Sequence, residues 1–406
     1  MSSTDAGPSS YRWTILGAGV VAQASFSGIF FGVPAIAPAI RSHYSLSLTQ
    51  VGVVLAAVSV GLTATLLLWG IVADRIGERT VLAVGLTGCS AALVGAAYST
   101  SFGALAIALA GAGAFGGGTQ TASGRAVMSW FGPEERGLAL GIRQTAVPLG
   151  GAIAATALPA IVHHASLRAA FLTLGGGCLA AALVGAGVLR AEASPERADP
   201  SRPLRDPRIW RLCLGSTFYV TTQISLVGFL VLFLHDERGL STTAGAAALA
   251  VTQALGGVAR IGAGRWSDRR RQRVAPLLRL GLLLALSATA AALLVGASLW
   301  LLLPAFVVAG TFSLSWNGLS FTAVAEIAGR ERSGAAIGLQ QSFLAVGSVV
   351  TPIAFAAIVH ASSWRTAFVL AALSPLAGYT LLRGVPDQVS PVDRSFQTDR
   401  RRSRRP

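Results

Sequence analysis

Long apolar stretches separated by short polar or charged segments run through almost the whole chain. The core of a bilayer is roughly 30 Å thick and requires about 20 helical residues to cross. Twelve largely uncharged stretches reach that length, at residues 13–40, 47–72, 80–100, 103–129, 137–162, 167–190, 209–234, 243–264, 275–299, 301–328, 333–360 and 364–383. The pattern therefore predicts an all-α membrane protein with twelve transmembrane helices.

A polar segment divides these stretches into two groups of six. Residues 191–208 read AEASPERADPSRPLRDPR, are rich in Pro and Arg and have no apolar periodicity, as expected of a solvated linker. We expect a polar N-terminal tail at 1–12, a six-helix bundle at 13–190, the linker, a second six-helix bundle at 209–383 and a basic tail at 384–406. The tail is expected to be solvated, with contact to the inner leaflet as the alternative.

The two halves repeat each other in sequence. Gly70-Ile-Val-Ala-Asp74-Arg75 recurs as Gly264-Arg-Trp-Ser-Asp268-Arg269, a shift of 264 − 70 = 194 residues. Farther along, at a shift of 197 residues, Gly137, Gly141, Gln144 and Gly150 correspond to Gly334, Gly338, Gln341 and Gly347. An internal duplication of six-helix units is typical of carriers that bind their solute between two bundles.

Composition and charge agree with a membrane protein and set its expected orientation. With 53% hydrophobic and 12% charged residues, the chain has more apolar surface than a soluble core can bury. Its net charge of +15 lies mainly in short segments between spans, so orientation explains it and a nucleic-acid partner is not needed. With the N-terminus inside, only four of the 32 basic residues, all of them arginines, fall outside: Arg41, Arg168, Arg238 and Arg365. Both termini are therefore expected on the cytoplasmic side of a bacterial inner membrane.

The loop between the second and third spans carries a recognisable motif. Residues 70–79, GIVADRIGER, resemble the signature G-x-x-x-D-R-x-G-R-R/K of the major facilitator superfamily. A weaker copy, GRWSDRRRQR at 264–273, lies where that family has its second copy, with Arg271 in place of the second glycine. The resemblance covers essentially the whole chain. It implies the major facilitator fold and a monomeric secondary transporter that works by alternating access without a cofactor.

The signature also has a physical interpretation. Glycines permit close helix approach or a tight turn, and an aspartate at a helix end can pair with a nearby arginine or a neighbouring helix. In the family this loop is thought to stabilise the outward-open state, and the resemblance implies the same role for both copies. The gating candidates are Gly70, Asp74, Arg75, Gly77, Arg79, Gly264, Asp268 and Arg269. The alternative, solvated charges that only set topology, is preferred for Arg270, Arg271 and Arg273.

Ionisable residues inside the spans are few, and each is a candidate for solute binding because a charge in the bilayer is costly. Glu326 is the one carboxylate within a span, near its inner end, whereas three arginines, Arg125, Arg143 and Arg260, lie deeper. At the repeat shifts these arginines correspond to Thr322, Gln340 and Leu66, so the duplicated scaffold does not itself require them. The alternative is that Arg143 and Arg260 extend towards the inner surface as ordinary interfacial residues.

A second resemblance concerns the substrate. Arg260 lies one helical turn before Gly264, a placement similar to the span-eight arginine that binds the anion in monocarboxylate and oxalate carriers and nitrate porters. The chain departs from those families at Gly256, where animal monocarboxylate carriers have aspartate, and at Leu66, where nitrate porters have arginine. A small organic anion is the favoured substrate, with a proton or counter-anion as candidate coupling ion. Efflux of drugs or hydrophobic compounds is the alternative, although Ile107 holds the place of the drug antiporters' span-four arginine.

Uncharged polar residues complete the candidate binding site. Those expected near the middle of the membrane include Gln23, Gln144, Tyr219, Asn317 and Gln341, for which hydrogen bonding between helices is the alternative role. Three cysteines have no ligand-like spacing, which argues against a zinc site. The chain has neither a phosphate-binding loop nor a nucleophile, base and acid constellation, so we expect a transporter and not an enzyme.

Overall fold

The computed structural model describes residues 11–131, 136–189, 206–270, 272–328 and 333–387. Within these ranges the chain is helical throughout, apart from short turns. Its elements are α1 (Tyr11–Ala35), α2 (Ala37–His43), α3 (Leu48–Ala97), α4 (Phe102–Trp130), α5 (Arg136–His164), α6 (Leu167–Val188), α7 (Pro207–Asp236), α8 (Thr242–Arg270), α9 (Val274–Leu293), the short 3-10 helix η2 (Leu294–Gly296), α10 (Leu299–Ser315), α11 (Asn317–Ala328), α12 (Ser333–Ala361) and α13 (Trp364–Leu382). Helices satisfy every backbone hydrogen bond within one segment, as the interior of a bilayer requires.

Twelve segments are long and apolar enough to cross a membrane, which confirms the predicted number of spans. Helix α3 contains two of them, Leu48–Leu66 and Ile76–Ala97, because the chain reverses at Gly77 with a φ of 79°. Conversely, α10 and α11 together form one span, Leu299–Ala328, that is broken at Trp316. The first apolar stretch is likewise divided into α1 and α2 at Ile36.

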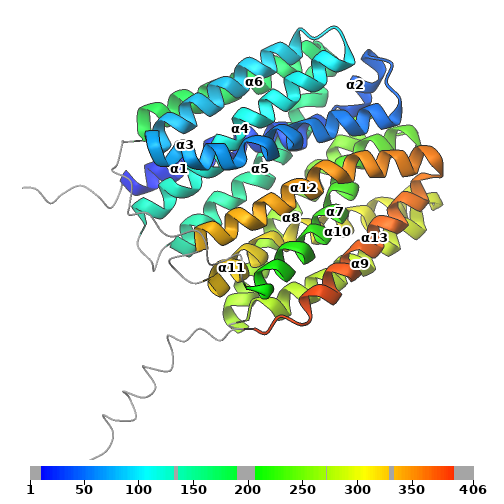
Figure 1. The fold of residues 1–406 in the computed structure, drawn as a ribbon. Coiled ribbons are helices and arrows are strands. Elements are labelled where there is room, and N and C mark those ends of the chain that lie inside the picture. The colour runs from blue at the N-terminus through cyan, green and yellow to red at the C-terminus, as the bar shows by residue number, and fades with distance from the viewer. Residues whose placement is uncertain (1–10, 132–135, 190–205, 271, 329–332, 388–406) are drawn as a thin grey trace, which may run out of the picture.

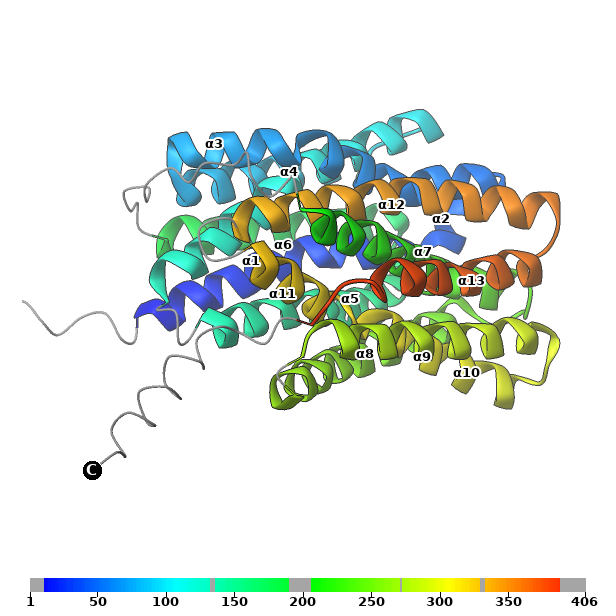
Figure 2. The same cartoon turned by 60° about the horizontal axis from the view of Figure 1, so that its bottom comes forward.

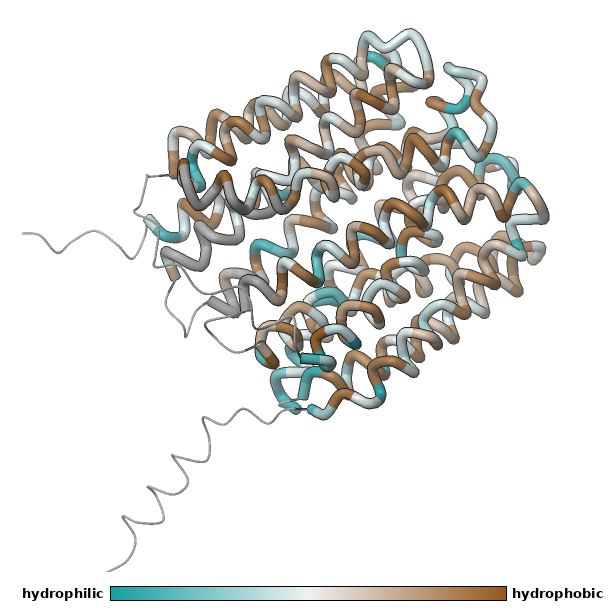
Figure 3. Tube along the Cα trace, in the orientation of Figure 1, coloured by the Kyte–Doolittle hydropathy of each residue, from teal (hydrophilic) through white to brown (hydrophobic). Residues whose placement is uncertain are grey.

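The spans are arranged in two bundles that lie side by side. Helices α1–α6 form the first bundle and α7–α13 the second, with α3, α5, α8 and α12 at their junction (Figure 1 and Figure 2). Apolar positions run along the helices, and hydrophilic positions gather mainly where helices end (Figure 3). The predicted all-α membrane fold with two six-span halves is confirmed.

The two ends of the bundles can be identified from side-chain contacts. The hydroxyl group of Tyr11, at the start of α1, donates to the carbonyl oxygen of Val188 at the end of α6, and the Tyr11 ring lies 5.5 Å from that of Trp130. At the other end, the hydroxyl group of Tyr44 donates to the carbonyl oxygen of Ser99 over 2.9 Å. We call these two faces the Tyr11 end and the Tyr44 end.

Glycines within the first bundle allow helices to come unusually close. A Cβ atom added at Gly113 of α4 would lie 1.9 Å from the carbonyl oxygen of Val58, and one added at Gly150 of α5 would lie 2.2 Å from that of Ala24. Neither space can hold a side chain, so these glycines serve helix packing in the way that small residues generally do in membrane bundles.

Two acidic residues that the sequence places in polar segments hydrogen-bond to the starts of helices. Asp206, assigned to the linker, accepts a hydrogen bond from the backbone nitrogen of Arg208 over 2.9 Å and caps α7. Asp387, assigned to the solvated tail, accepts from the backbone nitrogens of Arg273, Val274 and Ala275 over 2.9, 2.6 and 2.9 Å. The first N–H groups of a helix lack partners within it, so these carboxylates stabilise the starts of α7 and α9. Residues 190–205 and 388–406 lie outside the described residues.

Candidate functional site

The junction of α5 and α8 joins the two bundles through three successive residue pairs. From the Tyr44 end towards the Tyr11 end, the pairs are Gly151–Gln253, Pro148–Gly257 and Gln144–Arg260. Numbering falls along α5 as it rises along α8, so the two helices are antiparallel. A Cβ atom on Gly257 would lie 3.2 Å from Cγ of Pro148. This antiparallel contact, which we call the α5/α8 seam, is therefore closely packed.

A second junction, between α3 and α12, closes the bundles against each other nearer the Tyr44 end. A Cβ atom on Gly52 would lie 2.7 Å from the carbonyl oxygen of Pro352 and 2.8 Å from Cβ of Ala356. At the surface of the same end, Arg41 of α2 forms an ion pair with Asp236 at the end of α7. These contacts hold the two bundles together at the Tyr44 end.

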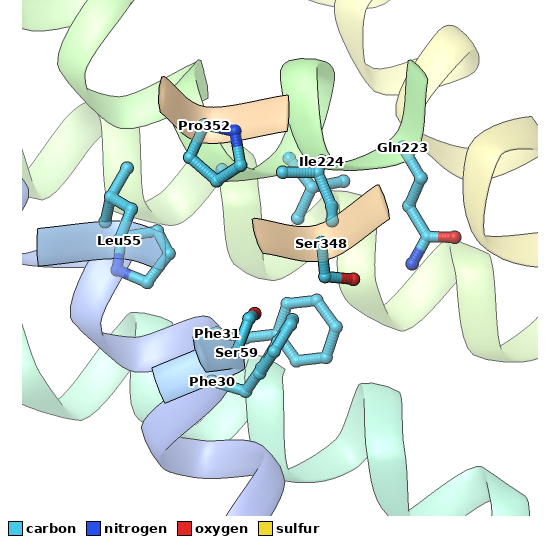
Figure 4. A pocket seen from close by; sticks show the side chains of 11 residues that line it. Phe30, Phe31, Leu55, Ser59, Gln223, Ile224, Ser348 and Pro352 are labelled. Carbon is cyan, nitrogen blue, oxygen red and sulfur yellow. The ribbon is translucent and has the colours of Figure 1, made fainter. Parts of the chain in front are cut away.

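A small cavity of about 30 Å³ lies between the bundles in the part nearer the Tyr44 end. Its walls come from α1, α3, α7 and α12 and include Phe31, Ser59, Gln223 and Ser348 (Figure 4). A volume of this size holds about one or two water molecules and no organic solute. The cavity itself is therefore too small for an organic solute in this conformation.

Arg143 of α5 is buried inside the first bundle, with 7% of its surface exposed. Its Nη1 atom donates to Oε1 of Gln23 in α1 and to Oγ of Ser123 in α4, each over 2.9 Å. Its Nε atom is buried and has no hydrogen-bond partner among the described residues. The guanidinium group therefore has neutral neighbours and a donor to spare.

The second bundle contains a related but uncharged triad. Gln340 of α12 donates from Nε2 to Oγ of Ser216 in α7, over 3.2 Å, and to Oγ of Ser320 in α11. Gln340 and Ser320 stand 197 residues after Arg143 and Ser123, the repeat shift found in the sequence. In each half, hydrogen bonds of this group therefore connect three helices. In the first half the central residue is a cation, Arg143, and in the second it is the neutral Gln340.

Arg260 of α8 reaches both bundles. Its Nε and Nη2 atoms donate to the carbonyl oxygen of Leu314 over 3.1 and 3.0 Å, and Nη1 donates to that of Gln144 in α5 over 3.3 Å. Leu314 lies in the last turn of α10, just before the break at Trp316, where carbonyl groups lack helical partners and the helix dipole attracts a cation. The break in this span thus leaves a backbone carbonyl oxygen free to accept hydrogen bonds from Arg260.

The other predicted binding residues are distributed unevenly. Asn317, at the start of α11, donates from Nδ2 to Oε1 of Gln223 over 3.1 Å, which brings it near the cavity that Gln223 lines. Gln341 is half-buried beside Gln340 and has no hydrogen-bond partner within the described ranges. The side chain of Arg125 lies outside the described residues.

Tyr219 lies away from the junction of the bundles. It is fully buried, and a Cβ atom on Gly281 of α9 would lie 2.0 Å from its hydroxyl oxygen. The edge of its ring approaches Gly378 of α13 in the same way, at 2.7 Å from Cε1. This position in the core of the second bundle does not support a role for Tyr219 in binding solute.

The first loop signature is only partly described. Gly77 has the positive φ that favours glycine, which confirms the expected turn. A Cβ atom there, or on Gly264 in the second copy, would meet nothing within 4 Å, so neither glycine lies at a close helix contact. Gly70 lies within α3, the side chains of Asp74 and Arg75 lie outside the described part of the structure, and Arg79 is exposed.

In the second copy of the signature, Arg273 is the centre of a charged cluster. It forms ion pairs with Asp268 and with Glu326 of α11, the latter over 2.9 Å. Partial burial would lower the pKa of Arg273, but its hydrogen bonds and the charges of the two carboxylates outweigh this effect and raise it. The preferred interpretation of Arg273 as a solvated topology charge is therefore wrong. Arg270 is exposed, in agreement with it, and Arg271 lies outside the described residues; the gating candidate Arg269 is exposed as well.

Sequence reasoning did not identify Ser123, Ser216, Ser320, Gln340 or Gln253 as residues of interest. The repeat shift of 197 residues could have indicated the first triad's counterpart, because it relates Arg143 to Gln340 and Ser123 to Ser320. Gln253 has no such signal, since its environment depends on what α5 presents opposite it.

Comparison with known proteins agrees with this geometry. Residues 17–320 and 275–405 match the family model described as Major Facilitator Superfamily. The chain is 30% identical over 387 residues to the uncharacterised MFS-type transporter Rv2994 of Mycobacterium tuberculosis. The aligned region covers 91% of this chain and 84% of Rv2994. The probable sulfoacetate transporter SauU of Cupriavidus necator is 36% identical over 141 residues, 34% of this chain and 32% of that one.

Among solved structures, the fold is similar to that of a bacterial homologue of the human lysosomal transporter Spinster in an inward-facing, occupied conformation. The TM-score is 0.74 at 18% identity, over 93% of this chain and 96% of that one. This similarity extends to both bundles and shows the fold. Together with the family match over nearly the whole sequence, it shows that the chain belongs to the major facilitator superfamily of transporters.

Proposed function

We propose that this transporter carries a small organic anion across the bacterial inner membrane by alternating access. The observation that carries the proposal is the pair Arg143 and Arg260. Arg143 is itself a residue of α5, and Arg260 donates a hydrogen bond to the backbone carbonyl oxygen of the next residue of α5, Gln144. Neither arginine has an ion-pair partner among the described residues.

The energetics of a buried cation support an anionic solute. A charge taken out of water is costly unless an opposite charge or strong hydrogen bonds compensate it. A carboxylate can accept two parallel hydrogen bonds from one guanidinium group, and such charge-assisted bonds are stronger than those to neutral groups. For Arg260 a carboxylate would replace bonds to neutral carbonyl oxygens, and for Arg143 it would supply an acceptor for the free Nε atom.

A cationic drug is a poorer match for this interface. Asp236, an acidic residue where the two bundles meet near the Tyr44 end, is already paired with Arg41. Over part of its length the chain is also similar to a probable sulfoacetate transporter, whose named substrate is an organic anion. Both observations favour an anion over the efflux of a hydrophobic cation.

The distribution of arginines supports the orientation that we propose. Arg265, Arg269 and Arg270 lie exposed at the Tyr11 end of α8. Positive residues concentrate on the cytoplasmic side of membrane proteins. In this orientation the Tyr11 end and both chain termini face the cytoplasm, and the closed Tyr44 end faces the exterior.

A ligand screen on the purified protein tests the proposed substrate class. Small mono- and dicarboxylates, a sulfonate and several lipophilic cations would be compared by their effect on the midpoint of thermal unfolding. A ligand that binds only the folded protein raises that midpoint in a concentration-dependent way. We expect stabilisation by at least one small anion; stabilisation by lipophilic cations alone would contradict the proposal.

A further inference from the structure

Gln253 of α8 has a buried amide group with no bonding partner. Its side chain is 0% exposed, and neither Nε2 nor Oε1 has a hydrogen-bond partner in the described part of the chain. A Cβ atom on Gly151 of α5 would lie 2.9 Å from Nε2 of Gln253 and 3.1 Å from Cβ of Phe31. A buried amide that loses its hydrogen bonds to water without replacing them destabilises the conformation that buries it.

The position of Gln253 connects this cost to the contact between bundles. It lies 11 residues into α8, or about 16 Å along the axis, and therefore near the middle of the membrane. On the same face of α8, Gly257 and Arg260 contact α5 at the next two levels of the α5/α8 seam. Opposite Gln253, α5 offers a glycine, which has no side chain with which to pair. The amide of Gln253 therefore finds no hydrogen-bond partner on the opposing face of α5.

Two other buried glutamines each have at least one hydrogen-bond partner, although Oε1 of Gln340 has none among the described residues, whereas both polar atoms of Gln253 are unpaired. Gln23 accepts a hydrogen bond from Arg143 over 2.9 Å, and Gln340 donates to Ser216 over 3.2 Å. In each case the partner belongs to the glutamine's own bundle. Gln253 differs because it is directed into the surface that must separate if the bundles are to move apart.

We propose that Gln253 is a positioning residue for transport, whose unpaired amide raises the free energy of the state in which the α5/α8 seam is closed. Opening of the seam exposes the amide to water or solute and removes that cost. Closure is favoured by the Arg41–Asp236 ion pair and by the packing of Gly52 against Pro352. A transporter needs both states at comparable free energy, and Gln253 opposes the contacts that favour closure. The inference rests on the proposed alternating access and is independent of the substrate class.

A cysteine in the small cavity reports whether the two bundles have separated at the Tyr44 end, the movement that also opens the seam. Ser348 is 8% exposed and lines that cavity, and a Ser348→Cys substitution is close in size. The three native cysteines, Cys89, Cys178 and Cys213, are buried and should contribute little labelling. A membrane-impermeant maleimide, added from the Tyr44 side in the absence of solute, would therefore measure the population of the open state.

The decisive variant is Gln253→Met, which keeps the length of the side chain and removes the amide. When Gln253→Met is combined with Ser348→Cys, we expect the cysteine to be labelled at least about fivefold more slowly than in Ser348→Cys alone. The reason is that removal of an unsatisfied buried polar group raises the ratio of closed to open state by at least that factor. Damage to packing would open the seam and speed labelling, so slowing cannot come from disruption. Gln253→Asn keeps an amide and should label at close to the wild-type rate. Equal rates for Gln253→Met and wild type would overturn the proposal.

A matched pair of glycine variants separates this inference from alternating access itself. In Gly151→Ala the new methyl group would lie 3.0 Å from Cδ of Gln253 and 3.1 Å from Cβ of Phe31 in the closed seam, closer than ordinary van der Waals contacts, so labelling should become faster. In Gly177→Ala on α6, where a Cβ atom meets nothing within 4 Å, it should be unchanged. If Gly151→Ala speeds labelling and Gln253→Met does not slow it, the bundles alternate but Gln253 does not oppose closure. If no variant changes the rate, both this inference and alternating access at the Tyr44 end fail.

Discussion

Replacement of Arg260 should lower the affinity for an anion by the free energy of the charged hydrogen bonds that its guanidinium group would donate. Arg260→Gln removes the charge and the planar pair of donors that a carboxylate would occupy. Loss of a charged hydrogen-bonding partner costs roughly 1.5–3 kcal/mol, or about 10- to 150-fold in affinity. Arg260→Lys keeps the charge but loses the fork of donors, so we expect an intermediate loss.

Titration of purified, folded variants with the best anion from the ligand screen would measure these affinities. Arg265→Gln is a matched control, because Arg265 lies on the same helix and is exposed at the Tyr11 end. Both Gln variants lose one positive charge, so a general effect of net charge would appear in both. Arg260 also donates to Leu314 and Gln144, and thermal unfolding without ligand would show how much those bonds stabilise the fold. Equal affinities for wild type and Arg260→Gln would show that Arg260 only joins α8 to α10 and α5.

Three further predictions concern other parts of the molecule. Arg143→Met should lower anion affinity about tenfold or more, as judged by the same titration, whereas Gln340→Met at the equivalent position of the second bundle should change it little. Asp387→Asn should lower the free energy of unfolding by about 1 kcal/mol, seen as a lower thermal midpoint, because the negative cap of α9 is lost; an unchanged midpoint would show that the cap is dispensable. Accessibility tags placed at the N-terminus, within residues 191–208 and at the C-terminus should all report the cytoplasmic side, and a tag on the opposite side within residues 191–208 would refute the proposed orientation.

The number of spans could be predicted from the sequence because it depends on the length of apolar stretches alone. The breaks within spans could not. The break at Trp316 divides α10 from α11 inside one uninterrupted apolar stretch, and Ile36 separates α1 from α2 in the same way. Proline is an ambiguous signal: Pro38 stands at the start of α2, next to the break at Ile36, but Pro148 and Pro352 lie inside helices that continue. Whether a span breaks therefore depends on how neighbouring helices pack.

The candidate site could be predicted in part. Arg143 and Arg260 were identified because charges inside spans are rare and costly, a property of the residue itself. Their partners come from other helices, and those of Arg260 are backbone carbonyl oxygens, which leave no mark in the sequence. Tyr219 shows the opposite error: a polar residue at the middle of a span was expected to face the solute, whereas it packs against Gly281.

Arg273 and Gln253 show why tertiary context decides the role of a residue. Arg273 belongs to a run of arginines that would set topology in any membrane protein, and only the fold brings Asp268 and Glu326 to it. Gln253 lies among small apolar residues in TTAGAAALAVTQALGG, where a single amide is unremarkable in composition. Its importance arises from Gly151 on the other bundle, more than 100 positions away in sequence.

Uptake into proteoliposomes would show whether the protein transports a small organic anion and whether Arg260 is required. The purified protein would be reconstituted, and counterflow of a labelled small carboxylate or sulfonate would be compared with that of a labelled lipophilic cation. We predict saturable, protein-dependent movement of the anion and competition by related anions. Arg260→Gln should abolish this movement, and Arg265→Gln should retain it. Movement of the cation without movement of any anion, or equal anion transport by Arg260→Gln and wild type, would contradict this prediction.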